Sequence, residues 1–106
     1  GVVKDEVEAA MWLRKAAEQG NVEAQCFLGL ALMNGEGVAK NQVEAAKLLR
    51  KAAEQGNADA QYNLGAALVN GLGVAENQVE AANWFRKAAE QGDVNAQGVL
   101  RLLGML

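Results

Sequence analysis

The heptapeptide RKAAEQG stands at residues 14–20, 50–56 and 86–92 of this chain, each copy 36 residues after the one before. Aligned on itself, the chain gives two consecutive blocks, residues 7–42 and 43–78, that are identical at 26 of their 36 positions. Self-similarity at a fixed period of about 20–50 residues is typical of repeat arrays, in which each unit packs on its neighbours. The sequence therefore predicts a solenoid of 36-residue units.

Each unit contains two helical stretches. In the second block these are QVEAAKLLRKAAEQ at residues 42–55, where apolar residues recur every three or four positions, and ADAQYNLGAALVN at residues 58–70. Between them, Gly56 suits a left-handed helix C-cap, and Asn57 can cap the next helix at once. Such a short joint forces the two helices into an antiparallel hairpin. We therefore predict an all-α fold of six helices in three helix-turn-helix pairs.

The length of 106 residues allows one domain. We assign residues 1–106 to a single repeat domain, with a first helix from about residue 5, repeats at 7–42 and 43–78, and a partial repeat at 79–106. Neither end carries an obvious polar capping helix, and the last segment, VLRLLGML, is apolar almost throughout. We expect a piece of a longer array, or an array whose ends stack on another copy.

Two glycines and two tryptophans predict packing contacts. Gly29 and Gly65 lie inside the second helix of their units, where glycine costs about 1 kcal/mol relative to alanine. We interpret them as points where the backbone of a neighbouring helix comes too close for a side chain. Trp12 and Trp84 share one register with Leu48, which indicates a packing position rather than a platform for stacking bases.

The composition excludes most enzyme chemistry. The chain contains no His, Ser or Thr, so it offers neither an imidazole base nor a hydroxyl nucleophile of the triad type. Its single cysteine, Cys26, allows no internal disulfide and no cysteine-based metal site. A net charge of −3 argues against nucleic acid or an anionic membrane as the main partner, because both need a basic face. We expect no enzymatic activity, no cofactor, no bound metal and no membrane insertion.

The positions that differ between repeats point to a contact surface. In the second helix they fall within an arc of roughly 120° at about 100° per residue, opposite the unchanged positions. Residues that pack repeat on repeat must stay alike, whereas a face that contacts something else is free to differ. The alternative is neutral drift, or adaptation to unequal neighbours at the ends of the array. We predict that a protein or peptide binds this stripe on the concave face of the array: Glu23, Cys26, Phe27, Leu30, Met33, Asp59, Tyr62, Asn63, Ala66, Val69, Asn95, Val99 and Leu102. Tyr62 is the strongest single candidate, since aromatic residues dominate interface energies.

Two motifs carry a family resemblance. The pattern A-x-x-W-x-x-K-A-A-x-Q-G occurs at residues 9–20 and 81–92, and L-G-x-x-x-x-x-G-x-G-V occurs at residues 28–38 and 64–74. With a period of 36, this combination resembles the Sel1-like repeat family, whose nearest relatives are the tetratricopeptide repeats with a period of 34. The resemblance implies a right-handed superhelix of helix pairs that serves as a non-enzymatic scaffold for protein complexes.

The chain departs from the pattern in its third unit, and other functions stay open. Arg101 falls where Gly29 and Gly65 stand, and Gly104 falls where Leu32 and Leu68 stand, which bears on how the last helix packs. A designed or consensus-type scaffold without a natural partner is one alternative, and a small-ligand-binding module is another. End-to-end self-association through the apolar C-terminal helix is a further expectation. The resemblance is compatible with the bacterial cytoplasm, the periplasm, secretion or the endoplasmic reticulum, so it sets no compartment.

Overall fold

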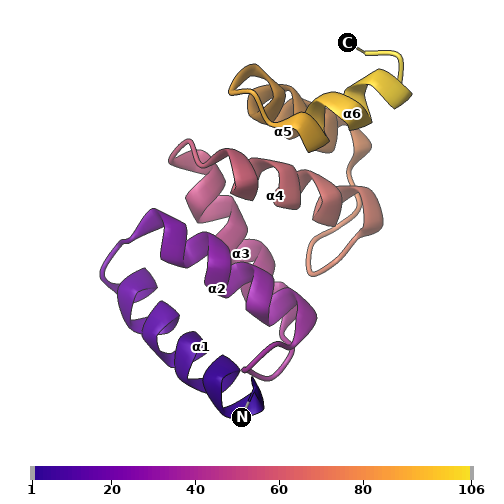
Figure 1. The fold of residues 1–106 in the computed structure, drawn as a ribbon. Coiled ribbons are helices and arrows are strands. Elements are labelled where there is room, and N and C mark those ends of the chain that lie inside the picture. Colours follow the sequence, from indigo (N-terminus) through magenta and orange to yellow (C-terminus); the bar gives the residue numbers. More distant parts are fainter. Residues whose placement is uncertain (1, 106) are drawn as a thin grey trace.

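The computed structural model describes residues 2–105, and these form helices and loops without a strand. The all-α fold class with six helices in three pairs is confirmed (Figure 1). The first helix begins earlier than the predicted residue 5. The helices are α1 (Val2–Glu18), α2 (Val22–Asn34), α3 (Gln42–Glu54), α4 (Ala58–Asn70), α5 (Gln78–Glu90) and α6 (Val94–Leu102).

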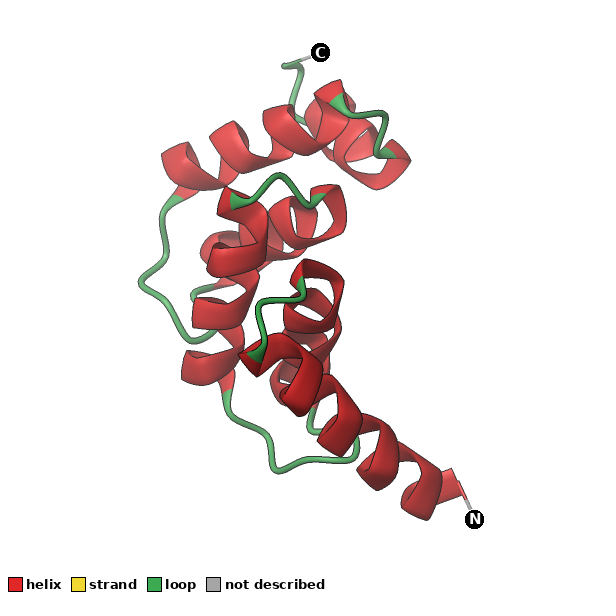
Figure 2. Ribbon diagram, turned by 90° about the vertical axis from the view of Figure 1, so that its left-hand side faces the viewer, coloured by secondary structure: helices red, strands yellow, loops and turns green. Residues whose placement is uncertain are grey.

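The helices stack in chain order. Each one packs against the next, and the most extensive contacts join α2 to α3 and α4 to α5, that is, the second helix of one pair to the first helix of the next. The array measures 43 × 23 × 23 Å and bends into an arc (Figure 2). The core is therefore built from nearest-neighbour interfaces, as expected of a repeat array.

The predicted joints within the pairs are confirmed at each hairpin. Gly56 has φ +95°, a left-handed conformation that glycine adopts without steric cost. The side chain of Asn57 then accepts a hydrogen bond from the backbone N–H of Ala60 at 2.8 Å. Gly20 with Asn21 and Gly92 with Asp93 repeat this geometry in the other two pairs.

The loop after each second helix crosses the first helix of the same pair. At Gly73, where φ is +72°, an added Cβ would overlap the backbone carbonyl of Gln42 at the start of α3. Gly37 makes the equivalent close approach to the backbone of Glu6 on α1. Only glycine fits there, because a side chain would meet backbone atoms that cannot turn aside.

The two glycines inside second helices receive a side chain from the next pair. A Cβ on Gly65 would lie 2.8 Å from the ring of Phe85 on α5, and a Cβ on Gly29 would lie 3.0 Å from Leu49 on α3. The predicted close approach is present, but the atoms that approach most closely belong to a side chain rather than to a helix backbone. Because glycine has no side chain, each of these two positions leaves a space on its helix, called here a glycine hole. A side chain from the first helix of the next pair fills it.

Ion pairs join successive pairs at both interfaces. Arg14 on α1 binds Glu44 on α3 with 3.0 Å between nitrogen and oxygen, and one repeat later Arg50 binds Glu80 at 2.6 Å. The indole Nε1 of Trp84 also donates to Glu80, at 3.0 Å. These charged contacts recur at the period of the sequence, so they fix the same register twice.

Buried glutamines add a second polar connection. The Nε2 of Gln61 donates to the carbonyl of Ala53 in its own pair, and its Oε1 accepts from the Nε2 of Gln91 in the next pair at 2.9 Å. Gln25 and Gln55 make the same contact one repeat earlier, at 3.0 Å. No buried side-chain nitrogen or oxygen of the described residues lacks a hydrogen-bond partner. The polar groups inside the stack are therefore satisfied, as burial requires.

The third pair ends differently. Helix α6 has 9 residues, whereas α4 has 13. Gly104 adopts φ +72°, and the N–H of Met105 bonds to the carbonyl of Leu100 at 2.8 Å, which closes the helix with a left-handed cap. Arg101 stands exposed at the register of the two receiving glycines. The outer surface of α6 therefore lacks the hole that the first two interfaces use.

Candidate protein-interaction surface

The unchanged positions of α2 and α4 are buried, except for the asparagine that ends each helix and for Ala31, which is half-buried. Leu28 and Leu32 on α2 are each 1% exposed, and Leu64 and Leu68 on α4 are equally enclosed. This matches the division of the helix into an alike side and a differing side. The unchanged side packs within the array, which leaves the differing side as the candidate surface.

The structure separates the predicted stripe into three groups. Exposed members are Glu23, Phe27, Asp59, Asn95 and Leu102; half-buried members are Leu30, Met33, Tyr62, Asn63, Ala66, Val69 and Val99; Cys26 is buried. The differing side of the helix is thus only partly open to a partner. Helices α2 and α4 each have two neighbours, their own first helix and the first helix of the next pair, so their buried arc is wider than that of a helix packed on one side.

Cys26 is the one member of the stripe that the structure removes from a contact surface. It is 2% exposed and lies in the core between the first two pairs. Burial raises the pKa of its thiol to about 11, and the charge of Asp59 adds to the effect. The thiol therefore stays protonated at neutral pH and can neither reach a partner nor act as a nucleophile.

Tyr62 has a structural contact of its own. Its ring centroid lies 5.7 Å from that of Phe85, with the planes tilted by 54°, and it packs against the central core. At the same register in the previous pair stand Cys26 and, opposite it, Leu49. Position 62 therefore varies together with the residue that fills the neighbouring glycine hole. The contact with Phe85 thus gives position 62 a structural reason to differ from Cys26 that involves no binding partner.

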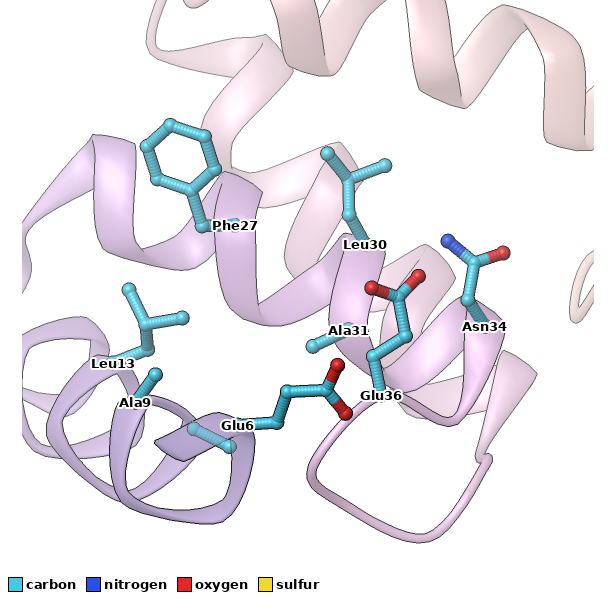
Figure 3. Close-up of a pocket in the computed structure, with 9 residues that line it drawn as sticks. Glu6, Ala9, Leu13, Phe27, Leu30, Ala31, Asn34 and Glu36 are labelled. Atoms are coloured by element: carbon cyan, nitrogen blue, oxygen red, sulfur yellow. The ribbon is translucent and has the colours of Figure 1, made fainter. Parts of the chain in front are cut away.

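Phe27 is the aromatic member of the stripe that stays open, with 53% of its surface exposed. It lies beside a groove of about 430 Å³ between α1 and α2 (Figure 3). The groove has apolar walls and carboxylates at the end away from Phe27. Its lining residues are Glu6, Ala9, Ala10, Leu13, Phe27, Leu30, Ala31, Asn34 and Glu36.

Several of these groove residues were missed by the sequence reasoning. Glu6 and Leu13 come from the first helix, and Glu36 comes from the loop, whereas the predicted stripe was confined to second helices. A signal existed, since Glu6 and Glu36 also differ from the residues one repeat later, Gln42 and Leu72. The crossing of α1 by the loop at Gly37 places Glu6 and Glu36 on the lining of one groove.

A second hollow lies on the other side of Phe27. It measures about 260 Å³ and is lined by Glu23, Cys26, Phe27, Asn57 and Asp59, from α2, α4 and the joint before α4. Neither α2 nor α4 contains a lysine or an arginine. Phe27 thus stands between two hollows, each bordered by two acidic side chains.

Residues 2–105 form neither a cluster of metal ligands nor a membrane-spanning helix. No group of three or more metal-ligating side chains occurs there, and none of those helices is both long and apolar enough to cross a membrane. The tryptophans differ in burial, because Trp84 is 8% exposed and Trp12 is 68% exposed. The predicted packing role is therefore present at Trp84 and absent at Trp12, which has no described helix on its outer side.

The repeats of this chain match a known repeat family. The family model described as Sel1 repeat matches residues 1–21, 22–57 and 58–93. The frame is shifted from the repeat boundaries predicted above, but its last two matches keep the spacing of 36 residues. A search of curated proteins found no match.

Solved structures of Sel1-type proteins are similar over most of the chain. A Sel1 repeat protein from Oxalobacter formigenes has a TM-score of 0.79 and 49% identity, over 85% of this chain and 37% of that one. The protective antigen c5321 of uropathogenic Escherichia coli, with an SLR fold, has a TM-score of 0.85 and 39% identity, over 92% of this chain and 22% of that one.

The cysteine-rich protein B of Helicobacter pylori has a TM-score of 0.79 and 33% identity, over 86% of this chain and 68% of that one. Unlike that cysteine-rich protein, this chain has a single cysteine, Cys26, which is free. The chain thus spans well under half the length of the first two structures. The repeat match and these structures agree on one assignment: the chain belongs to the Sel1 repeat family.

Proposed function

We propose that this chain is a non-enzymatic scaffold module that binds a protein or peptide across its second helices. Sel1 repeat proteins are generally protein-interaction scaffolds without catalysis, which gives the class of function. The observation that carries the proposal here is Phe27, a large aromatic ring left 53% exposed between two hollows. Exposed aromatic residues beside concave surfaces are the usual anchors of interfaces.

The proposed contact face is the concave side of the arc. The direct contact of α2 with α4 supports this, because second helices that touch lie on the inner side of a bend. The partner would cover Phe27 and Leu30 first, with Asp59 and Asn63 on α4 adding polar contacts. Tyr62 would contribute only its exposed part, since Phe85 covers one side of its ring.

The test compares two exposed aromatic residues. A partner captured from the native lysate and then purified should bind Phe27→Ala about 10–100-fold more weakly than the unchanged chain, as expected for an interface anchor. Trp12→Ala is the matched control, because Trp12 is even more exposed but lies on the first helix and lines neither hollow. Equal affinity for the Phe27→Ala variant and the unchanged chain, measured by calorimetry, would reject the proposed face.

Self-association is a second candidate, favoured by the exposed apolar residues near the C-terminal end. Leu102 is 89% exposed and Leu103 is 58% exposed, and Leu103 lines a hollow of about 450 Å³ with Val79 and Arg86 on α5. Arg101 fills the place of the receiving glycine, so a second copy would have to dock differently from a repeat. Sedimentation equilibrium of the unchanged chain and of Leu102→Asp tests this: association lost in the variant supports it, and a monomer at every concentration rejects it.

A further inference from the structure

We infer that the occupant of the groove between α1 and α2 is a peptide segment that carries a large apolar side chain close to a lysine or arginine. This inference rests on the proposed function and names the chemistry of the partner.

The walls of the groove select an apolar side chain. Leu13 from α1 and Phe27 and Leu30 from α2 face the same space, with alanines between them (Figure 3). Phe27 is half-exposed, so an apolar group placed against its ring removes apolar surface of both molecules from water. A side chain of leucine or aromatic type therefore gains most from this groove.

The end of the groove selects a positive charge. In Figure 3 the side chain of Glu6 extends toward that of Glu36 at the end of the groove away from Phe27, whereas the carboxylate of Glu36 points away from Glu6. The ion pairs of the described side chains are Arg14 with Glu44 and Arg50 with Glu80, so neither carboxylate of the groove is neutralised by one. Two carboxylates at one end of the groove attract positive charge, so a partner gains there from an ammonium or guanidinium group.

The surrounding surface has the same sign. Glu23 and Asp59 border the hollow on the other side of Phe27, and α2 and α4 carry no lysine or arginine. Helices α2 and α4 therefore contribute only negative charge to the surface around Phe27. This charge favours basic partners and repels acidic ones.

The next repeat provides an internal control. One period later, Gln42 replaces Glu6, Asn63 replaces Phe27 and Leu72 replaces Glu36. The second pair therefore lacks both the aromatic wall and the two charges, although its two helices contact each other as extensively as α1 and α2 do. If the groove were merely a by-product of the helix pair, these features would recur with it.

The first experiment is a selection of random displayed peptides on the immobilised full chain. The inference expects enriched peptides in which a leucine or an aromatic residue lies near lysine or arginine. One enriched peptide is then synthesised, and its affinity is measured by fluorescence anisotropy. Because the proposed contact includes ion pairs, the affinity should fall as salt is raised.

Variants then locate the peptide. Phe27→Ala should weaken its binding about 10–100-fold, and Glu6→Gln combined with Glu36→Gln should weaken it roughly tenfold and flatten its salt dependence. The matched controls Trp12→Ala, an exposed aromatic residue outside the groove, and Glu76→Gln, in the corresponding loop of the next repeat, should leave it unchanged. Circular dichroism melts check that each variant is folded.

The outcomes separate the inference from the proposed function. Enriched peptides that are acidic or uncharged, with binding that still needs Phe27, would overturn the basic-apolar occupant and keep the binding face. No enrichment at all, or peptides that bind the Phe27→Ala variant equally well, would overturn both.

Discussion

The two interfaces between helix pairs share their polar contacts and differ in their apolar filling. Both carry an arginine–glutamate pair and a glutamine–glutamine hydrogen bond at the same register. Between α2 and α3 the hole at Gly29 receives Leu49, whereas between α4 and α5 the hole at Gly65 receives Phe85, with Tyr62 against its ring. Polar contacts depend on direction, so they must recur to keep the register. Apolar volume only has to fill space, so it can change as long as both sides change together.

The outer surface of α6 differs from the corresponding surfaces of α2 and α4. Arg101 occupies the register of the receiving glycine, and Gly98 has no neighbouring atom within 4 Å of an added Cβ. Gly65, in contrast, is enclosed by a ring. Glycines of one chain thus serve different purposes, and their neighbours distinguish them better than their positions in the repeat.

The largest loss of stability is expected where the loop after a second helix packs against the first helix of its own pair. Gly73→Ala should cost about 2–5 kcal/mol of unfolding free energy, because it adds the strain of a left-handed alanine and a clash with the backbone of Gln42. Gly56→Ala is the matched control, with a similar positive φ and no atom within 4 Å, and should cost about 1–2 kcal/mol. Urea unfolding measures both. Equal losses would mean that the loop can move away from α3.

The buried glutamines come next in expected effect. Gln61→Leu should cost about 1–3 kcal/mol, because the Nε2 of Gln91 and the carbonyl of Ala53 each lose a partner. Gln97→Leu should cost less, because Gln97 is half-buried and bonds only to the carbonyl of Ala89. The free energies of unfolding of the two variants decide the matter, and a Gln97 variant that loses as much as the Gln61 variant would contradict the connecting role.

Substitutions at the two glycine holes test how tightly the apolar side chains fill each interface. Gly65→Ala should cost about 1–2 kcal/mol net, since overpacking against Phe85 outweighs the gain in helix propensity. Gly29→Ala should cost less, because its Cβ would lie 3.0 Å from the side chain of Leu49 and 3.3 Å from the carbonyl of Ala45, farther than the 2.8 Å to the ring of Phe85. In Gly65→Ala combined with Phe85→Leu, the interface imitates the first one, so the alanine should cost less than it does beside Phe85.

A third glycine gives the opposite sign. Gly98→Ala should stabilise the chain by about 0.5–1 kcal/mol, because it gains helix propensity without a clash. The thermal midpoint of this variant should therefore rise while that of Gly65→Ala falls. A fall in both would show that alanine fits neither helix.

Much of this architecture could be predicted from the sequence, because it depends on local rules. A glycine followed by a capping residue, as at Gly56 and Asn57, sets the joint of a hairpin wherever it occurs, and the repeat then multiplies it. The hole at Gly65 could also be predicted, but its occupant could not, since the identity of Phe85 as the inserted residue depends on how far apart two helices settle.

The candidate surface was harder to predict for a physical reason. The arc of differing positions was drawn on one helix alone, whereas the burial of a side chain depends on every neighbouring helix. For this reason Cys26 lies in the core and Tyr62 packs against Phe85, although both belong to the predicted stripe. The groove at Phe27 required three elements to converge, α1, α2 and the loop through Gly37. Its acidic end was visible only as differences at Glu6 and Glu36, outside the helix to which the stripe was confined.

The smallest predicted effect concerns the ion pair between α3 and α5. Hydrogen bonds from Arg50 and then Trp84 lower the pKa of Glu80 below its ordinary value of 4.5. A carboxyl group whose pKa is lowered by folding stabilises the fold above its unfolded pKa, and this stabilisation is lost as the pH falls through the folded pKa. Glu80→Gln should therefore destabilise the chain near neutral pH and much less in strong acid, by under about 1 kcal/mol because the side chains are one-third exposed.

The first interface supplies the comparison for this carboxylate. Glu44 binds Arg14 but has Leu48 where Glu80 has Trp84, so it accepts no indole hydrogen bond. Glu44→Gln should then lose less stability at neutral pH than Glu80→Gln, and high salt should shrink both losses. Unfolding midpoints across the acid range measure the difference. If the Glu80 loss were independent of pH, the amide would be disturbing packing around Trp84, and the ion pair would not be the source of the effect.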